Sequence, residues 1–157
     1  KFDRQNLEIE VANLIRSHPN LGAVWANEAM PAVIWGLRGA LSPQDEFPLV
    51  LCEPTRDGLN IWKTIQEEYP NFTCIALSNP PGIAYDAVYA AYYLLSGKSI
   101  NPQALGGKYG QTLYVEIPMV TQENLAECLD KIAGEANDYI LDKRMSPQEV
   151  LEAWFLD

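Results

Sequence analysis

The sequence predicts an α/β protein built on a sheet of parallel strands. Three short apolar runs, at residues 22–26, 48–52 and 73–77, are separated by segments in which apolar residues have helical spacing. Each run ends in a polar or turn-forming cluster. Strands that alternate with helices are typical of a wound parallel sheet, in which ligands bind beyond the carboxyl ends of the strands. We therefore expect the polar clusters to face a ligand.

The helices in the first half of the chain are predicted from apolar residues that recur every three or four positions. Residues 4–17 and 30–41 show this spacing, and each segment ends at a turn that contains proline. A third helix is predicted over 58–68, with Asp57 as the residue whose side chain accepts a backbone N–H at the N-cap. These helices alternate with the three apolar runs, as connections between parallel strands require.

The second half of the chain begins with a predicted helix over 83–95 that is apolar on nearly every side and so needs cover on more than one face. The run 113–120 is predicted as a strand that either lies at a sheet edge or ends near Ile117, because Pro118 cannot donate to a sheet ladder. We then expect a helix that Thr121 caps and that runs to about residue 133. The last helix is predicted to start at Ser146-Pro147-Gln148-Glu149, which has the spacing of a capping box.

Length and charge favour a single globular domain. The chain has 157 residues, 48% of them apolar, which is enough for one sizeable core. Its formal charge of -10 is spread without a long run of one sign, which argues against a nucleic-acid or anionic-membrane surface. The sequence contains neither a long apolar stretch nor a signal-peptide pattern. Because the chain starts at Lys1 and enters a helical pattern at once, we expect it to be part of a longer protein.

Little in the sequence indicates catalysis. The single histidine, His18, lies in the turn that ends the first predicted helix, and the motifs of nucleotide binding and of a nucleophilic serine do not occur. The cysteines Cys52, Cys74 and Cys128 lack metal-binding spacing, and the first two lie in apolar runs that predict core positions. We therefore expect a binding protein without cofactor or metal, and not an enzyme.

The candidate ligand-binding residues stand at the ends of the predicted strands. Asn27 and Glu28 follow the first run, Glu53 the second, and Ser78 and Asn79 the third. Carboxylates, amides and hydroxyls can each satisfy several hydroxyl groups of a polyol. Glu28 and Glu53 could instead act as an acid/base pair, but no nucleophile or metal ligand accompanies them, which favours hydrogen bonding to a ligand.

Trp25 lies in the first run, just before these polar residues. Its place on one face of a strand predicts that the indole packs in the core. If the ring faced the crevice, it would offer a flat surface on which a sugar could stack.

Four segments carry a family resemblance: residues 2–30 with their SHPN turn and following Asn-Glu cluster, VLCEPTRDG at 50–58, residues 75–100 with their L-x-G-K end, and PMVTQEN at 118–124. Together they resemble the C-terminal lobe of periplasmic sugar-binding proteins of the ribose-binding type, the type I solute-binding proteins of ABC transporters. Glu53 stands where that family usually carries an aspartate.

The resemblance implies a parallel-sheet, three-layer α/β/α lobe of the type I periplasmic-binding-protein fold. Residues 1–157 would form the C-terminal portion of a solute-binding domain, with 81–118 as an interlobe crossing whose helix packs on an N-terminal lobe, and 134–157 as a helical extension. Ligand contacts carry over to Asn27 or Glu28, to Glu53, and to Ser78 or Asn79.

The same resemblance implies a function. A bacterial protein of this kind holds a monosaccharide or related polyol between two lobes, of which this chain supplies one, and delivers it to the membrane permease of an ABC transporter. Its location would be the periplasm, or the outer face of the cell membrane as a lipoprotein.

Two alternatives belong to other classes. The effector-binding domain of a transcription regulator of the lac repressor type shares the lobe architecture, although the extension at 134–157 favours the transport proteins. A carboxylate-dependent enzyme of flavodoxin-like fold would work through Glu28 and Glu53. If the chain is part of a longer protein, the apolar helix 83–95 would normally pack against the absent lobe. The chain alone is then expected to expose a patch on the order of several hundred Å2 and either to dimerise through it or to rearrange this helix.

Overall fold

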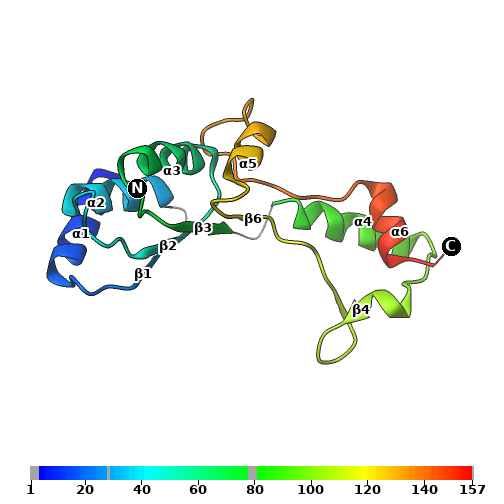
Figure 1. Ribbon diagram of the computed structural model, residues 1–157. Helices are drawn as coiled ribbons and strands as arrows, with labels where there is room; N and C mark the ends of the chain where they lie inside the picture. The colour runs from blue at the N-terminus through cyan, green and yellow to red at the C-terminus, as the bar shows by residue number, and fades with distance from the viewer. Residues whose placement is uncertain (1–3, 28, 78–80, 157) are drawn as a thin grey trace. The chain divides into compact units, whose positions relative to one another are not determined.

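The computed structural model describes residues 4–27, 29–77 and 81–156, which form two compact units. Unit 1 comprises Lys1–Ser78 and Met119–Leu141, and unit 2 comprises Asn79–Pro118 and Asp142–Asp157. The chain therefore passes from one unit to the other at 78/79, 118/119 and 141/142. Figure 1 shows the elements of both units.

Unit 1 is an α/β structure with a mostly parallel sheet. Its described elements are α1 (Arg4–Ser17), β1 (Ala23–Trp25), α2 (Met30–Ala40), β2 (Leu49–Cys52), α3 (Arg56–Glu68), β3 (Cys74–Leu77), β6 (Met119–Val120) and α5 (Leu125–Lys131). Strands β1, β2 and β3 are parallel neighbours, and β6 is antiparallel to β3, so that the sheet order is β1-β2-β3-β6.

One face of this sheet is buried beneath helices. Val50, Cys52 and Ala76 point to this face and lie in one core cluster with buried residues of α1, α2, α3 and α5. Among the described residues, the largest fully buried side chain is Trp62 of α3. Figure 1 shows α2, α3 and α5 on the same side of the strands.

No described helix of unit 1 covers the other face of the sheet. Trp25, Leu51 and Ile75 are register partners in adjacent strands and share this face, and none of them belongs to the core cluster. Leu77 and Met119, paired in β3 and β6, are also exposed. The described helices of unit 1 that pack on the sheet thus lie on one of its faces, whereas the family resemblance implies helices on both. The connections from β1 to β2 and from β2 to β3 each move one strand in the same direction across the sheet. Because such connections are right-handed, α2 and α3 lie on the same face.

Helices α1 and α2 pack at close range. A Cβ atom at Gly36 would lie 2.7 Å from Cβ of Val11 and 2.8 Å from the carbonyl oxygen of Glu8. Real side chains do not fit at such distances, so glycine at this position permits the contact. Val11 and Ile15 are thereby placed in the core.

Unit 2 is built around two helices, α4 (Ile83–Leu95) and α6 (Pro147–Trp154). Between them in sequence lie a 3-10 turn (Pro102–Ala104) and a small antiparallel hairpin of β4 (Leu105–Gly106) and β5 (Thr112–Leu113). Its core cluster contains Ala90, Val150, Trp154 and Phe155.

Two aspartates tie the segment before α6 to α4. The backbone N–H of Gly82 donates to Oδ1 of Asp142 at 2.8 Å, and the N–H of Met145 donates to Oδ1 of Asp86 at 2.9 Å. The capping box predicted at Ser146–Glu149 is confirmed, with both of its reciprocal hydrogen bonds formed.

Three sequence predictions about local structure are wrong. The run 113–120 is not one strand: Leu113 ends β5, and pairing resumes only at Met119, beyond Pro118. Thr121 does not cap α5, because its own N–H donates to Oδ1 of Asn124, the N-cap residue. Asp57 lies in the first turn of α3, and the N-cap is Thr55.

Candidate functional site

Two of the predicted ligand residues follow the carboxyl ends of neighbouring parallel strands. Trp25 and Leu51 are register partners, and Asn27 and Glu53 each follow two residues later. The N–H of Ala26 donates to the carbonyl of Leu51 at 2.9 Å, so the ladder continues to the residue before Asn27. Asn27 is exposed and Glu53 is half-buried. Glu28, Ser78 and Asn79 lie outside the described residues.

The loop that carries Glu53 is held by a distant part of the chain. The carbonyl of Pro54 accepts from the N–H of Leu141 at 2.9 Å, and the N–H of Arg56 donates to the carbonyl of Tyr139 at 2.8 Å. Thr55 forms an antiparallel bridge with Ile140. The turn after β2 is therefore fixed by residues 139–141 and does not depend on its own sequence alone.

The same loop opens helix α3. Oγ1 of Thr55 accepts from the N–H of Gly58 at 3.2 Å, which makes Thr55 the N-cap. The N–H of Asp57 donates to the carbonyl of Asn137 at 2.9 Å, and the guanidinium of Arg56 donates to Oδ1 of Asn137 at 3.0 Å. Glu53 thus stands between a buried strand and a capped helix, and both ends of its turn are anchored.

Trp25 is the residue that the sequence placed wrongly. Its side chain is 82% exposed at the end of β1, on the uncovered face of the sheet. The strand offered a signal for this. Successive side chains of a strand point to opposite faces of the sheet, so Ala23 and Trp25 share one face and Val24 lies on the other. Val24 packs against the core, and Trp25 therefore points away from it.

The cysteines have a structural role, as predicted for Cys52 and Cys74. All three are buried free thiols. Burial raises the pKa of Cys52 to about 12 and also raises the pKa values of Cys74 and Cys128. A thiol with a raised pKa is mostly protonated near neutral pH and is a poor nucleophile. Across the described residues, no group of histidine, cysteine and acidic side chains has the arrangement of a metal site.

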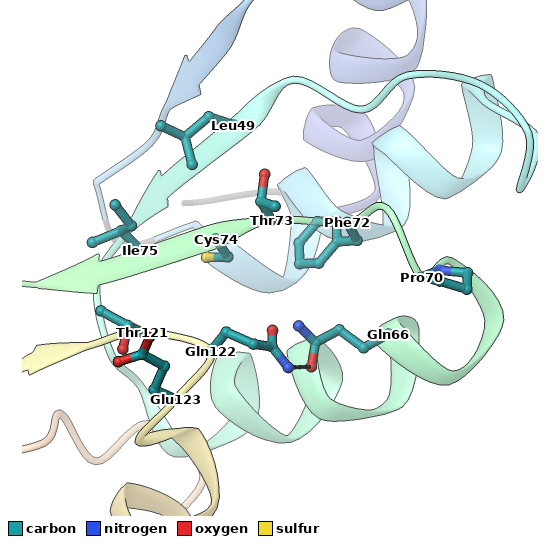
Figure 2. A pocket seen from close by; sticks show the side chains of 10 residues that line it. All are labelled: Leu49, Gln66, Pro70, Phe72, Thr73, Cys74, Ile75, Thr121, Gln122 and Glu123. Carbon is teal, nitrogen blue, oxygen red and sulfur yellow. Dashed lines mark hydrogen bonds between the residues drawn. The ribbon is translucent and has the colours of Figure 1, made fainter.

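A cavity of about 670 Å3 lies at the opposite end of the sheet (Figure 2). Leu49 and Cys74, which line it, are the first residues of β2 and β3. The cavity exists because β6 pairs with β3 at only two positions and the chain then turns away at Thr121. None of the predicted ligand residues lines it.

The lining of this cavity mixes apolar and polar groups. Nε2 of Gln122 donates to Oε1 of Gln66 at 2.7 Å, as Figure 2 shows, which links the segment after β6 to α3. Sequence reasoning missed the cavity, because it depends on how two strands distant in sequence diverge. The apolar sequence pattern of β3 carries no signal of that divergence.

Two further findings concern the chain as a whole. None of the described helices combines the length and the apolar character that crossing a membrane requires. Comparisons of the chain with protein-family models, with curated proteins and with solved structures found no match.

Proposed function

We propose that this chain is the sugar-binding component of an ABC transporter and that the carboxyl edge of its parallel sheet forms one wall of the ligand site. The observation that carries the proposal is the exposed indole of Trp25 at the end of β1, in register beside the strand that leads to Glu53. A sugar presents apolar C–H faces and a rim of hydroxyl groups. An indole offers a flat surface on which the C–H face can stack, and amide and carboxylate oxygens accept hydrogen bonds from the hydroxyl groups.

The anchoring of the Glu53 turn also supports this proposal. Hydrogen bonds from residues 139–141 hold the turn before any ligand arrives. A side chain on a prearranged turn loses less conformational freedom when it binds a ligand, so more of the interaction energy contributes to affinity.

In this proposal, unit 1 is the C-terminal lobe of a type I periplasmic-binding-protein fold. The ligand is a monosaccharide or related polyol, held between this lobe and a second one. The protein works outside the cytoplasmic membrane and passes its ligand to a membrane permease. The parallel order of β1, β2 and β3 and the polar residues after their ends are compatible with that role.

The first test is a thermal-shift screen of the full-length, two-lobed protein against monosaccharides and polyols, followed by calorimetry of any hit, because this chain alone supplies only one wall of the proposed site. A ligand present at a hundredfold over its Kd adds about 2.7 kcal/mol to the free energy of unfolding. We expect Trp25→Ala to weaken binding at least tenfold and to change the unfolding midpoint without ligand only slightly, since the indole is exposed.

Glu53→Gln and Trp35→Phe complete the design. Glu53→Gln removes the charge but keeps the shape, and we expect it to weaken binding of a polyol. Trp35 lies on α2 beneath the guanidinium of Arg38, so Trp35→Phe is the matched tryptophan control and should bind normally. A hit that neither Trp25→Ala nor Glu53→Gln affects would place the ligand elsewhere, and a panel without any hit would count against sugar binding.

A further inference from the structure

Unit 2 contains a buried acidic group that the proposed sugar site does not use. Asp86 of α4 is 2% exposed, and it is the one buried charged residue in the described part of the chain. Within the same part, its carboxylate receives one hydrogen bond, from the N–H of Met145 to Oδ1 at 2.9 Å. A carboxylate has room for about four donors, so most of its accepting capacity is unused.

The described residues also give Asp86 no cationic partner. Among the ion pairs of the described residues, none involves Asp86. A buried charge is costly unless it is paired and hydrogen-bonded. The hydrogen bond to Met145 does not explain the charge, because an uncharged asparagine would accept from the same N–H.

Asp86 lines a cavity of about 240 Å3. The chemically distinctive residues around it are Asp86, Tyr114, Glu116, Lys143, Met145 and Trp154. Nζ of Lys143 forms an ion pair with Oε2 of Glu116, so these two charges offset each other and the charge of Asp86 is left over. The volume is below the range of about 300–1,000 Å3 that drug-sized ligands occupy, which points to a smaller molecule.

We propose that this cavity binds a small primary ammonium compound with a short carbon chain. The ammonium group supplies the positive charge and up to three donors that the Asp86 carboxylate lacks. The aromatic side chains of Trp154 and Tyr114 line the same cavity, and aromatic faces attract a cation. The carbon chain would lie against Met145 and Trp154. This site is separate from the proposed sugar site, so neither proposal depends on the other.

The experiment is a titration of the full chain with n-propylamine, which is an ammonium ion at pH 7, and with 1-propanol as the neutral compound of similar size. The indole N–H signal of Trp154 in a 15N–1H NMR spectrum, assigned by Trp154→Phe, reports on the cavity. Measurements at 0.15 M NaCl limit unspecific attraction to the acidic surface, because the Debye length is then about 8 Å. We expect n-propylamine to shift the Trp154 signal saturably, with a Kd at least tenfold lower than that of 1-propanol.

Two aspartate variants make the test specific. Asp86→Asn keeps an acceptor for the Met145 N–H and removes the charge, and we expect it to weaken n-propylamine binding at least tenfold. Asp142→Asn is the matched control, because Asp142 accepts from the N–H of Gly82 in the same manner and does not line the cavity. It should bind n-propylamine within twofold of the unaltered chain.

Three results would overturn the proposal: equal binding of the amine and the alcohol, unchanged amine binding in Asp86→Asn, or amine-induced shifts that spare Trp154. If Asp86→Asn does not fold, the comparison of n-propylamine with 1-propanol on the unaltered chain decides the question without it. Binding of 1-propanol alone would also overturn the proposal and would identify the cavity as an apolar space with no preference for charge.

Discussion

The buried thiols have the clearest consequence at the scale of single residues. Cys52 and Cys74 occupy adjacent strands on the covered face of the sheet, where burial raises both pKa values. The unfolded chain returns each thiol to its ordinary pKa of about 8.5. The folded protein therefore keeps protons that the unfolded chain loses above that pH.

This difference predicts that the protein loses stability in alkaline solution. Below about pH 8.5 both states hold the thiol protons, and the full contribution of the buried thiols is present. As the pH rises from there toward about 12, where Cys52 titrates in the folded state, the free energy of unfolding falls. One such group changes the slope by up to about 1.4 kcal/mol per pH unit. Urea denaturation between pH 7.5 and 10.5 measures that slope.

Cys52→Ala and Cys74→Ala separate the thiols from other groups that titrate in this range. Each variant should show a shallower decline than the unaltered chain, although each begins from a lower stability because it leaves a small cavity in the core. Identical slopes for all three proteins would mean that the thiols do not remain protonated in the folded state.

At the scale of elements, the start of α3 connects stability to the proposed ligand site. Thr55 caps the helix two residues after Glu53, and its hydroxyl accepts from the N–H of Gly58. Thr55→Ala removes that acceptor, and we expect a loss of about 1 kcal/mol in the free energy of unfolding. Urea denaturation at neutral pH measures the loss.

Thr64→Ala is the matched control for this prediction. Oγ1 of Thr64 donates to the carbonyl of Asn60 in the exposed middle of the same helix. Alanine has the higher helix propensity there, so its stability should stay the same or rise slightly. If both variants lost equal stability, the cap would have no special role, and the turn would be held by residues 139–141 alone.

The elements themselves were largely predictable from the sequence. Four helical predictions are confirmed to within two residues at each end: 4–17, 30–41, 58–68 and 83–95. Each was predicted from the spacing of apolar residues within its own segment. The three parallel strands are confirmed too. Local periodicity was sufficient in both cases.

What the sequence could not predict depends on contacts between distant residues. Thr55, and not Asp57, is the N-cap of α3. Thr55 forms a β-bridge with Ile140, and the N–H of Leu141 donates to the carbonyl of Pro54, so residues distant in sequence hold this turn. Trp25 is exposed because the described helices of unit 1 that pack on the sheet cover its other face. By contrast, the sequence did predict that Asn27 and Glu53 follow neighbouring strands at one edge of the sheet, and the register of Trp25 with Leu51 places each of them two residues beyond that pair.

At the scale of the whole molecule, two apolar surfaces remain uncovered within the described residues. One is the open face of the sheet in unit 1. The other, on α4 of unit 2, is a stripe of exposed side chains spaced three and four residues apart, made of Tyr85, Val88, Tyr92 and Leu95. Parallel sheets are normally covered on both faces, and helices with such a stripe commonly pack against another helix.

These surfaces predict that the isolated chain self-associates through α4. The formal charge of -10 on each copy opposes association, so we expect dimers at micromolar concentration to become more populated as salt screens the repulsion. Sedimentation velocity at 0.05 M and 0.5 M NaCl measures this. Tyr92→Glu places a charge in the middle of the stripe and should shift the chain to monomer, while Lys63→Glu on the exposed side of α3 adds negative charge away from it.

The comparison of these two variants distinguishes a specific surface from general charge effects. Both make the chain more acidic by one or two charges, so a change common to both would reflect repulsion alone. A monomer in Tyr92→Glu with a persistent dimer in Lys63→Glu locates the interface on α4. If Trp25→Glu abolishes the dimer and Tyr92→Glu does not, the open face of the sheet is the surface that associates. A chain that stays monomeric at both salt concentrations contradicts the prediction, since screening leaves the apolar attraction unopposed.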